Sequence, residues 1–340
     1  MGGRDVSRAY EGEISFCPAG ARSGIWRIVA AYSHSHEACS SRFYMPVLQQ
    51  RSYIDFSVEA LPTMPAPRRV LMTTPAHFEV VYVINPHMEG HIGTVDRSRA
   101  QGQWQDLKSA YERIGIRPAV IEGSPGQPDM VFCANQTLPF TTGGKNGVFL
   151  SRMEAPQRRD EVTHYARFFS SIGYTTVPLP DATAGSFEGM GDAIWHPGRA
   201  LLWGGYGYRT DAGVYPFIAE RLGVPVVLLE LTDSDFYHLD TCFSVLDERS
   251  VLIYPGAFTQ AGVELIHALF ERVIEAPDDE SRTLFACNAH CPDGRHVLIQ
   301  RGCRVTNERL REAGYEPIEL DTDEFLKSGG SVFCMKQMYW

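Results

Sequence analysis

The sequence predicts an α/β fold made of five similar modules arranged about a pseudo-symmetry axis. After residue 67, an amphipathic helical pattern, a turn and a short β-rich run recur five times. Each copy leads to a short segment of unusual composition, and these segments begin at residues 128, 187, 238, 285 and 331. This near-constant spacing predicts loops that converge on one pocket. A doubly wound parallel sheet is the alternative, because it also alternates helix and strand, but it would not need charged residues inside the recurring apolar runs.

The first helix has the clearest signals at both ends. Its apolar side chains fall on one helical face: Ala100, Trp104, Leu107, Tyr111 and Ile114. Asp96 is placed to cap the start of this helix. Gly115 is placed to stop it before the β-rich run "RPAVIE".

The other four copies follow the same order. Three of them contain a glycine stop between helix and strand: residues 161–180 "EVTHYARFFSSIGYTTVPLP", 214–231 "VYPFIAERLGVPVVLLEL" and 307–321 "NERLREAGYEPIELD". The fourth copy, residues 262–276 "GVELIHALFERVIEA", lacks this glycine. A helix followed by a strand is predicted in each.

Two regions are predicted along the chain. Residues 1–66 show no sustained period and end in the proline-rich "LPTMPAPRR", so we expect an N-terminal extension and a candidate mobile segment. Residues 67–340 form the predicted modular domain. With 340 residues and 44% apolar composition, the chain can bury a sizeable core.

Charge and hydropathy exclude several classes of partner. A net charge of −10 argues against nucleic acid, because phosphate binding needs a basic face. No apolar stretch reaches the length of a membrane span, and the N-terminus lacks a basic region followed by an apolar one. The eight cysteines contain no CxxC pair, which favours reduced thiols. We therefore expect a cytoplasmic protein with a small-molecule substrate; the sequence does not predict its oligomeric state.

Three clusters could suggest a metal, and none is completed. The segment "HSHEAC" at residues 34–39 and the segment "CNAHC" at 287–291 lack further ligands at a usual spacing. His87 and His91 are separated by one helical turn, but Pro86 and Gly90 disfavour a helix there. The sequence predicts no metal and no cofactor.

The recurring segments carry residues suited to thiol catalysis. A cysteine nucleophile needs a histidine to move protons, and carboxylates to position a cationic substrate or the imidazole. The segments supply these types in Cys334, His238, Glu188, Asp240 and Asp192. Singly, a cysteine in an apolar run is more often a core residue. The shared period makes a common site the stronger interpretation.

These segments resemble a known superfamily. "FEGMGDAIW", "FYHLDTCFSVL" and "SGGSVFCMKQ" resemble motifs of the guanidino-group-modifying enzymes, which include arginine deiminases, dimethylarginine dimethylaminohydrolases and amidinotransferases. The resemblance implies an α/β-propeller of five pseudo-repeated modules, the pentein fold. "YVINPHMEG", "PDMVFCANQ", "VFLSRM", "WGGYGYR" and "YPGAF" are similar to the catalytic domain of arginine dihydrolases, over about residues 69–338. Residues 67–340 would then be the catalytic domain.

The resemblance implies a covalent mechanism. Cys334 would attack the guanidinium carbon, and His238 would protonate the departing nitrogen and then activate water. Glu188 and Asp240 would hold the guanidinium by charge-assisted hydrogen bonds.

The same resemblance implies further substrate contacts. Arg152 and Arg209 would bind the substrate α-carboxylate, while Asn85 and Asp192 would complete the binding site. Asn135 discriminates between activities, because the matching residue is Asp in arginine deiminases and Asn in the dihydrolases. An amide offers a donor as well as an acceptor, so a neutral urea could stay bound for a second attack.

Several functions stay open at this point. We favour arginine dihydrolase, which converts arginine to ornithine, carbon dioxide and two ammonia. Dimethylarginine dimethylaminohydrolase and arginine deiminase are the nearest alternatives, and an amidinotransferase would require an added amine. A non-catalytic arginine-binding protein would keep the fold, but it has no need of a thiolate.

Overall fold

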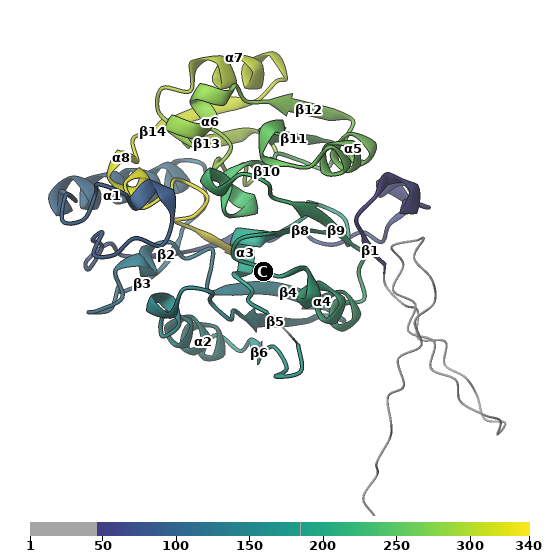
Figure 1. Cartoon of the computed structure of the whole chain (residues 1–340), viewed down its shortest axis with the longest axis horizontal. Coiled ribbons are helices and arrows are strands. Elements are labelled where there is room, and N and C mark those ends of the chain that lie inside the picture. Colours follow the sequence, from purple (N-terminus) through teal and green to yellow (C-terminus); the bar gives the residue numbers. More distant parts are fainter. Residues whose placement is uncertain (1–45, 184) are drawn as a thin grey trace, which may run out of the picture. The chain divides into compact units, whose positions relative to one another are not determined.

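The computed structural model describes residues 46–340 except residue 184, and all structural statements concern this part of the chain. Its strands form five separate sheets, with helices between them (Figure 1). The predicted mixed α/β class is confirmed. The metal candidate at residues 34–39 lies outside the described residues.

Four of the sheets share one plan of an antiparallel pair followed by a parallel strand. In one sheet, β4 (Thr137–Thr142) pairs antiparallel with β5 (Lys145–Leu150), and β5 pairs parallel with β6 (Thr175–Val177). Two others repeat it: β7 (Ala193–Trp195), β8 (Leu202–Tyr206) and β9 (Val226–Glu230), then β10 (Phe243–Val245), β11 (Ser250–Ile253) and β12 (Arg272–Glu275). The exception is the two-stranded sheet, in which β13 (His296–Gln300) and β14 (Glu316–Leu320) pair in parallel and only an isolated antiparallel bridge joins His290 to Leu298.

The remaining sheet joins the two ends of the modular domain. β15 (Gln337–Tyr339) pairs antiparallel with β2 (Arg69–Thr73), and β2 pairs parallel with β3 (Ala119–Ile121). Cys334 lies three residues before β15. The pairing therefore brings the C-terminal cysteine segment beside the first module.

In every sheet, a helix links the two successive strands that pair in parallel, as this pairing requires. These crossover helices are α1 (Arg97–Arg113), α2 (Glu161–Ser171), α4 (Tyr215–Leu222), α5 (Gln260–Leu269) and α7 (Arg304–Glu312). Three shorter helices are α3 (Gly189–Asp192), α6 (Asp278–Leu284) and α8 (Asp323–Leu326). The predicted helix-to-strand order is observed in all five copies.

Helix ends follow the local signals in the sequence. The Asp96 side chain accepts a hydrogen bond from the backbone of Arg99 and caps α1. Gly115 adopts a φ of 84°, which ends the helix at little steric cost. Helix α5 ends without glycine, because Phe270 turns to an extended conformation.

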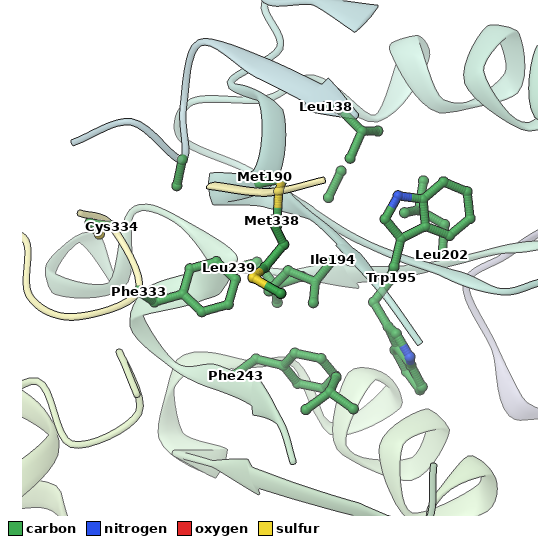
Figure 2. Packing of buried hydrophobic residues seen from close by; sticks show 14 of the residues in the cluster. Leu138, Met190, Ile194, Trp195, Leu202, Leu239, Phe243, Phe333, Cys334 and Met338 are labelled. Carbon is green, nitrogen blue, oxygen red and sulfur yellow. The ribbon is translucent and has the colours of Figure 1, made fainter. Parts of the chain in front are cut away.

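In the apolar core, side chains of α3 and β7 pack against the C-terminal strand β15. Figure 2 shows Met190 of α3, Met338 of β15 and Ile194 of β7 close together, with Phe333 and Cys334 on the same C-terminal run. Figure 1 also places the C-terminus beside α3. The segment that carries Cys334 is thus anchored by a buried strand immediately after it.

Part of the predicted N-terminal extension is described. β1 (Val47–Leu48) pairs parallel with β9, and Thr63 forms an isolated bridge with Arg199. Residues 46–66 therefore contact the modular domain, while the domain boundary at residue 66 stays a prediction. None of the helices in the described residues is long and apolar enough to cross a membrane.

Candidate active site

Residues from distant parts of the sequence line one narrow pocket. Its lining comes from residues 84–88, 129–158, 209–238 and 328–334: Ile84, Asn85, Met88, Asp129, Phe132, Asn135, Arg158, Arg209, Tyr237, His238, Ser328, Gly329 and Cys334. The predicted convergence of the recurring segments therefore brings His238 and Cys334 to one pocket. Among the described residues, no group of three or more histidine, cysteine or acidic side chains is placed to hold a metal ion.

The Cys334 thiol is held between two polar side chains. Its Sγ donates to Asp240 Oδ2 at 3.2 Å and accepts from Asn288 Nδ2 at 3.1 Å. Asn288 Oδ1 accepts from the backbone amides of Ser331 and Cys334, at 3.0 and 3.3 Å, and Asn288 Nδ2 donates to the backbone carbonyl of Asp240. Burial, followed by the charge of Asp240, raises the pKa of Cys334 well above its ordinary value.

The turn before the thiol needs glycine. Gly329 has a φ of 81°, and a Cβ there would lie 2.7 Å from Tyr237 Oη and 2.9 Å from Asn85 Oδ1. Tyr237 Oη donates to the Gly329 carbonyl at 2.6 Å. This close approach fixes the cysteine segment against the loop that carries His238.

His238 has one ring nitrogen on a carboxylate and the other near an amide. Its Nε2 lies 2.7 Å from Glu188 Oε2, and its Nδ1 lies 3.5 Å from Asn135 Nδ2. Burial alone would raise the pKa of Glu188, but Arg209 and His238 together lower it to about 2. Because an ionised carboxylate only accepts, Nε2 carries the proton and Nδ1 is left as the basic nitrogen.

Asn135 is oriented by an arginine that the sequence analysis missed. Arg158 Nη1 donates to Asn135 Oδ1 at 3.0 Å, which turns the amide nitrogen toward His238. Arg158 is buried and pairs with Glu161 at 2.9 Å. No local signal in "APQRRDE" separates it from Arg159, so only the folded loop identifies it.

Of the two arginines predicted to bind a carboxylate, one reaches the pocket. Arg209 lines it, pairs with Glu188 at 3.3 Å and lies over the Tyr237 ring, with 4.9 Å between Cζ and the ring centre. The Arg152 guanidinium is not in the lining. It donates to the backbone carbonyls of Leu179, Pro180, Thr183 and Gly185. These carbonyls hold Arg152 in a structural position.

Of two further predicted site residues, Asn85 lines the pocket and Asp192 lies outside its lining. Asn85 lines the pocket and donates to the Ser328 carbonyl at 3.1 Å. Asp192 is absent from the lining: it accepts from the backbone of Leu239 and from Thr210, at 2.9 and 2.7 Å. Asp192 therefore supports the loop of His238 from behind. Burial raises its pKa to about 6.

The chain was compared with protein families and known proteins. The model of eukaryotic N,N dimethylarginine dimethylhydrolase matches residues 88–338. The N(G),N(G)-dimethylarginine dimethylaminohydrolase of Mycobacterium tuberculosis is 40% identical over 79% of this chain and 85% of its own length. The bifunctional arginine dihydrolase/ornithine cyclodeaminase of Synechocystis sp. is 37% identical over 78% of this chain, which spans only 37% of that protein.

Solved structures agree with the sequence relatives. The N-terminal domain of the cyanobacterial arginine dihydrolase ArgZ, bound to substrate, has a TM-score of 0.74 at 36% identity and covers 79% of this chain and 97% of its own. A dimethylarginine dimethylaminohydrolase with a TM-score of 0.67 is 22% identical, covers 80% of this chain and 99% of its own, and shares the fold. The chain therefore belongs to the dimethylarginine dimethylaminohydrolase family, within the superfamily of guanidino C–N hydrolases that also holds the arginine dihydrolases.

Proposed function

We propose that this chain is an arginine dihydrolase that works through a covalent intermediate on Cys334. The single observation that carries this proposal is the orientation of Asn135 beside His238. The reaction consumes arginine and two water molecules and yields ornithine, carbon dioxide and two ammonia.

In the first half of each round, the Cys334 thiol gives its proton to His238 Nδ1, and the resulting thiolate adds to the guanidinium carbon or, in the second round, to the ureido carbon. The C–N bond to the departing nitrogen then breaks, and His238 Nδ1 delivers the proton that lets ammonia leave. Glu188 and Asp240 are acceptors for the guanidinium N–H groups. The 3.2 Å contact between Cys334 and Asp240 and the 2.7 Å contact between His238 and Glu188 support these roles.

In the second half, water replaces the thiolate on the same carbon. His238 Nδ1 accepts a proton from the attacking water, the S–C bond breaks, and Cys334 is restored. The product of the first round is citrulline, which is neutral at its ureido group. A second round releases the second ammonia and leaves a carbamate on the side-chain nitrogen of ornithine; its N–C bond then breaks to give carbon dioxide and ornithine.

Asn135 is the residue that we expect to permit the second round. Its carbonyl oxygen is committed to Arg158, so its amide N–H groups face His238 and the reacting end of the pocket. An N–H donor can bind the oxygen of a urea, whereas an ionised aspartate at this position could only accept. Citrulline therefore has a donor to hold it in place.

One buried arginine would bind the substrate α-carboxylate. Arg209 lines the pocket, whereas Arg152 does not. Arg158 also lines it, but its nitrogens already donate to Asn135, to Glu161 and to backbone carbonyls. A planar guanidinium suits a carboxylate because it offers paired donors. We therefore assign this role to Arg209, with Asn85 as a further substrate contact.

The second candidate is dimethylarginine dimethylaminohydrolase, which would release citrulline and dimethylamine. The matching family model and the 40% identical mycobacterial relative favour it. Arginine deiminase is a third candidate, with one round and accumulating citrulline. Membership of a hydrolase family argues against a non-catalytic binder. The five-module propeller, the cytoplasmic location and the absence of a cofactor stay predictions.

The product balance separates these candidates. We expect purified protein to release two ammonia and one ornithine per arginine, with no lasting citrulline. One ammonia with stable citrulline would overturn the dihydrolase, and faster turnover of dimethylarginine with release of dimethylamine would establish the second candidate. Asn135→Asp is the matched variant, because it keeps the side-chain size and should stop the reaction at citrulline.

A further inference from the structure

A lysine that follows the proposed nucleophile by two residues is fully buried. Lys336 is 0% exposed, and its Nζ has no partner among the described residues. The ammonium group lies 3.0 Å from the centre of the Phe333 ring. Lys336 follows Cys334 by two residues and immediately precedes β15, so the buried strand fixes its place.

The titratable groups around Lys336 come from several segments. Its charge acts on Asp240, Cys133 and Cys334, and also on His290, whose ring packs against Phe333. His290 Nδ1 is hydrogen-bonded to Tyr111 Oη at 2.7 Å. Arg158 acts from further away on Asp240 and Cys133. Of these, Asp240 and Cys334 are in direct contact with each other.

Asp240 has an unused oxygen in the same cluster. Its Oδ2 accepts from the Cys334 thiol, but its buried Oδ1 has no partner among the described residues. Among the described residues the amine has no hydrogen-bond partner and the carboxylate has one unpartnered oxygen, and this burial is costly because each charged form loses hydration. Apolar residues would make a more stable core here, and such local costs concentrate at functional sites.

Burial favours the neutral forms of both Lys336 and Asp240 near neutral pH. It lowers the pKa of Lys336 to about 7 and raises the pKa of Asp240 to about 7. The pair can therefore exist as two neutral groups or as an ion pair. Only in the ion-pair state does Asp240 carry the negative charge that binds a guanidinium substrate.

We propose that Lys336 is a positioning residue whose ammonium keeps Asp240 ionised and offsets the repulsion between Asp240 and the Cys334 thiolate. Loss of the thiol proton, to water or to His238 Nδ1, creates a second negative charge 3.2 Å from Asp240 Oδ2. A nearby cation stabilises both charges. This inference rests on the proposed role of Cys334 as the nucleophile.

Alkylation of the thiol tests the charge effect directly. Cys334 of the full chain is treated with iodoacetamide over a series of pH values, and modification is read by mass spectrometry of the peptide that contains it. Below about pH 7, where Lys336 carries its charge, alkylation of Lys336→Met should be about tenfold slower than that of wild type. Well above pH 7 the lysine is neutral, so the two rates should converge. Lys108→Met, which removes a surface lysine paired with Glu112, is the matched control and should leave the alkylation rate unchanged at every pH.

Stability provides the second readout. Lys336→Met should raise Tm because it removes the cost of a buried amine, whereas a merely structural lysine would lower Tm on removal. An unchanged alkylation rate below about pH 7 in folded Lys336→Met overturns the proposal. Lys336→Gln serves the same comparison if the methionine variant does not fold, and an unchanged rate there also overturns it.

The alkylation result is independent of substrate turnover. Slower alkylation of Lys336→Met below about pH 7, in a protein that releases no ammonia from arginine, would leave the Lys336 inference standing and refute the proposed function. An unchanged rate in an active dihydrolase would refute the Lys336 inference and leave the proposed function standing.

Discussion

Two fully buried carboxylates beside the pocket have pKa values that move in opposite directions. Glu188 belongs to the histidine half of the site, which we define as Glu188, His238 and Arg209. Asp240 belongs to the thiol half, defined as Asp240, Asn288, Cys334 and Lys336. The pKa of Glu188 falls to about 2, and that of Asp240 rises to about 7.

The difference follows from the partners rather than from depth. Both carboxylates are 0% exposed, so burial raises both pKa values. Arg209 and His238 outweigh that cost at Glu188, whereas Asp240 contacts a neutral thiol and has one oxygen with no hydrogen-bond partner among the described residues. In the histidine half Glu188 is thus charged in the free protein, whereas in the thiol half Asp240 and Cys334 become charged during the reaction.

The largest effect is expected from removing the thiol. Cys334→Ala should lower kcat/KM by about 10³-fold or more, because the covalent step is lost. The measurement is ammonia release from the best substrate found. Cys303→Ala removes a buried cysteine of a separate apolar cluster and should retain activity. Equal activity of Cys334→Ala and wild type would refute the covalent route.

The next largest effect is expected in the histidine half. Glu188→Gln removes the charge that holds His238 and Arg209, so kcat should fall about 10²-fold. It should also lower the free energy of unfolding by about 3 to 5 kcal/mol, because the Arg209 charge stays buried and unpaired. Urea unfolding measures this loss.

A surface pair is the matched control for Glu188. Glu248→Gln breaks a partly exposed ion pair with Arg199 and should cost no more than about 1 kcal/mol. Equal losses from the two variants would contradict the strong pairing that we assign to the histidine half.

A smaller loss of rate is expected from Asn288 in the thiol half. Asn288→Ala removes the donor to Cys334 Sγ and the acceptor for two backbone amides. We expect about tenfold lower kcat and about 1 to 3 kcal/mol lower stability, because buried amides lose their partner. Asn288→Asp keeps the oxygen that accepts from the two backbone amides but loses the donor to Cys334 Sγ. Relative to Asn288→Ala, it should therefore recover more of the stability than of kcat. A variant with reduced stability but unchanged kcat would limit Asn288 to a structural role.

The two halves should respond to pH with opposite slopes of stability. Glu188 has a folded pKa of about 2, below its ordinary 4.5, so its stabilisation is complete above about 4.5 and is lost as the pH falls toward 2. Asp240 has a folded pKa of about 7, above its ordinary 3.8, so its contribution is complete below 3.8 and is lost as the pH rises through 7.

Thermal melting measures both slopes. Relative to wild type, the Tm of Asp240→Asn should improve as the pH rises from about 4 to about 8, while the Tm of Glu188→Gln should worsen as the pH rises from about 2 to about 5. Parallel curves for the two variants would show that their environments do not differ as described.

The smallest effect on the reaction is expected at Arg152, which lies outside both halves. Arg152→Met should leave KM within about twofold of wild type and lower stability by about 1 to 3 kcal/mol, because its carbonyl partners lose their donor. Arg209→Lys is the contrasting variant, and its KM should rise about tenfold or more. A raised KM in Arg152→Met alone would restore the predicted role of Arg152.

Local patterns were sufficient to predict the helices and their order. The apolar face of residues 100–111, the Asp96 cap and Gly115 act within a few residues, so their outcome does not depend on distant chain. The pairing of β15 with β2 could not be predicted in this way. It joins residues that are far apart in sequence, and neither strand has a local sequence pattern that identifies the other as its partner.

The sequence by itself determined the five helix-to-strand units and the convergence of Glu188, His238, Asp240 and Cys334, because a repeated unit places equivalent loops alike. Only the tertiary structure decided which arginine reaches the pocket, that Asp192 supports the loop of His238, and that Asn288 and Lys336 surround the thiol. Long side chains can point toward substrate, backbone carbonyls or core from the same position. The neighbours that select among these directions come from other modules.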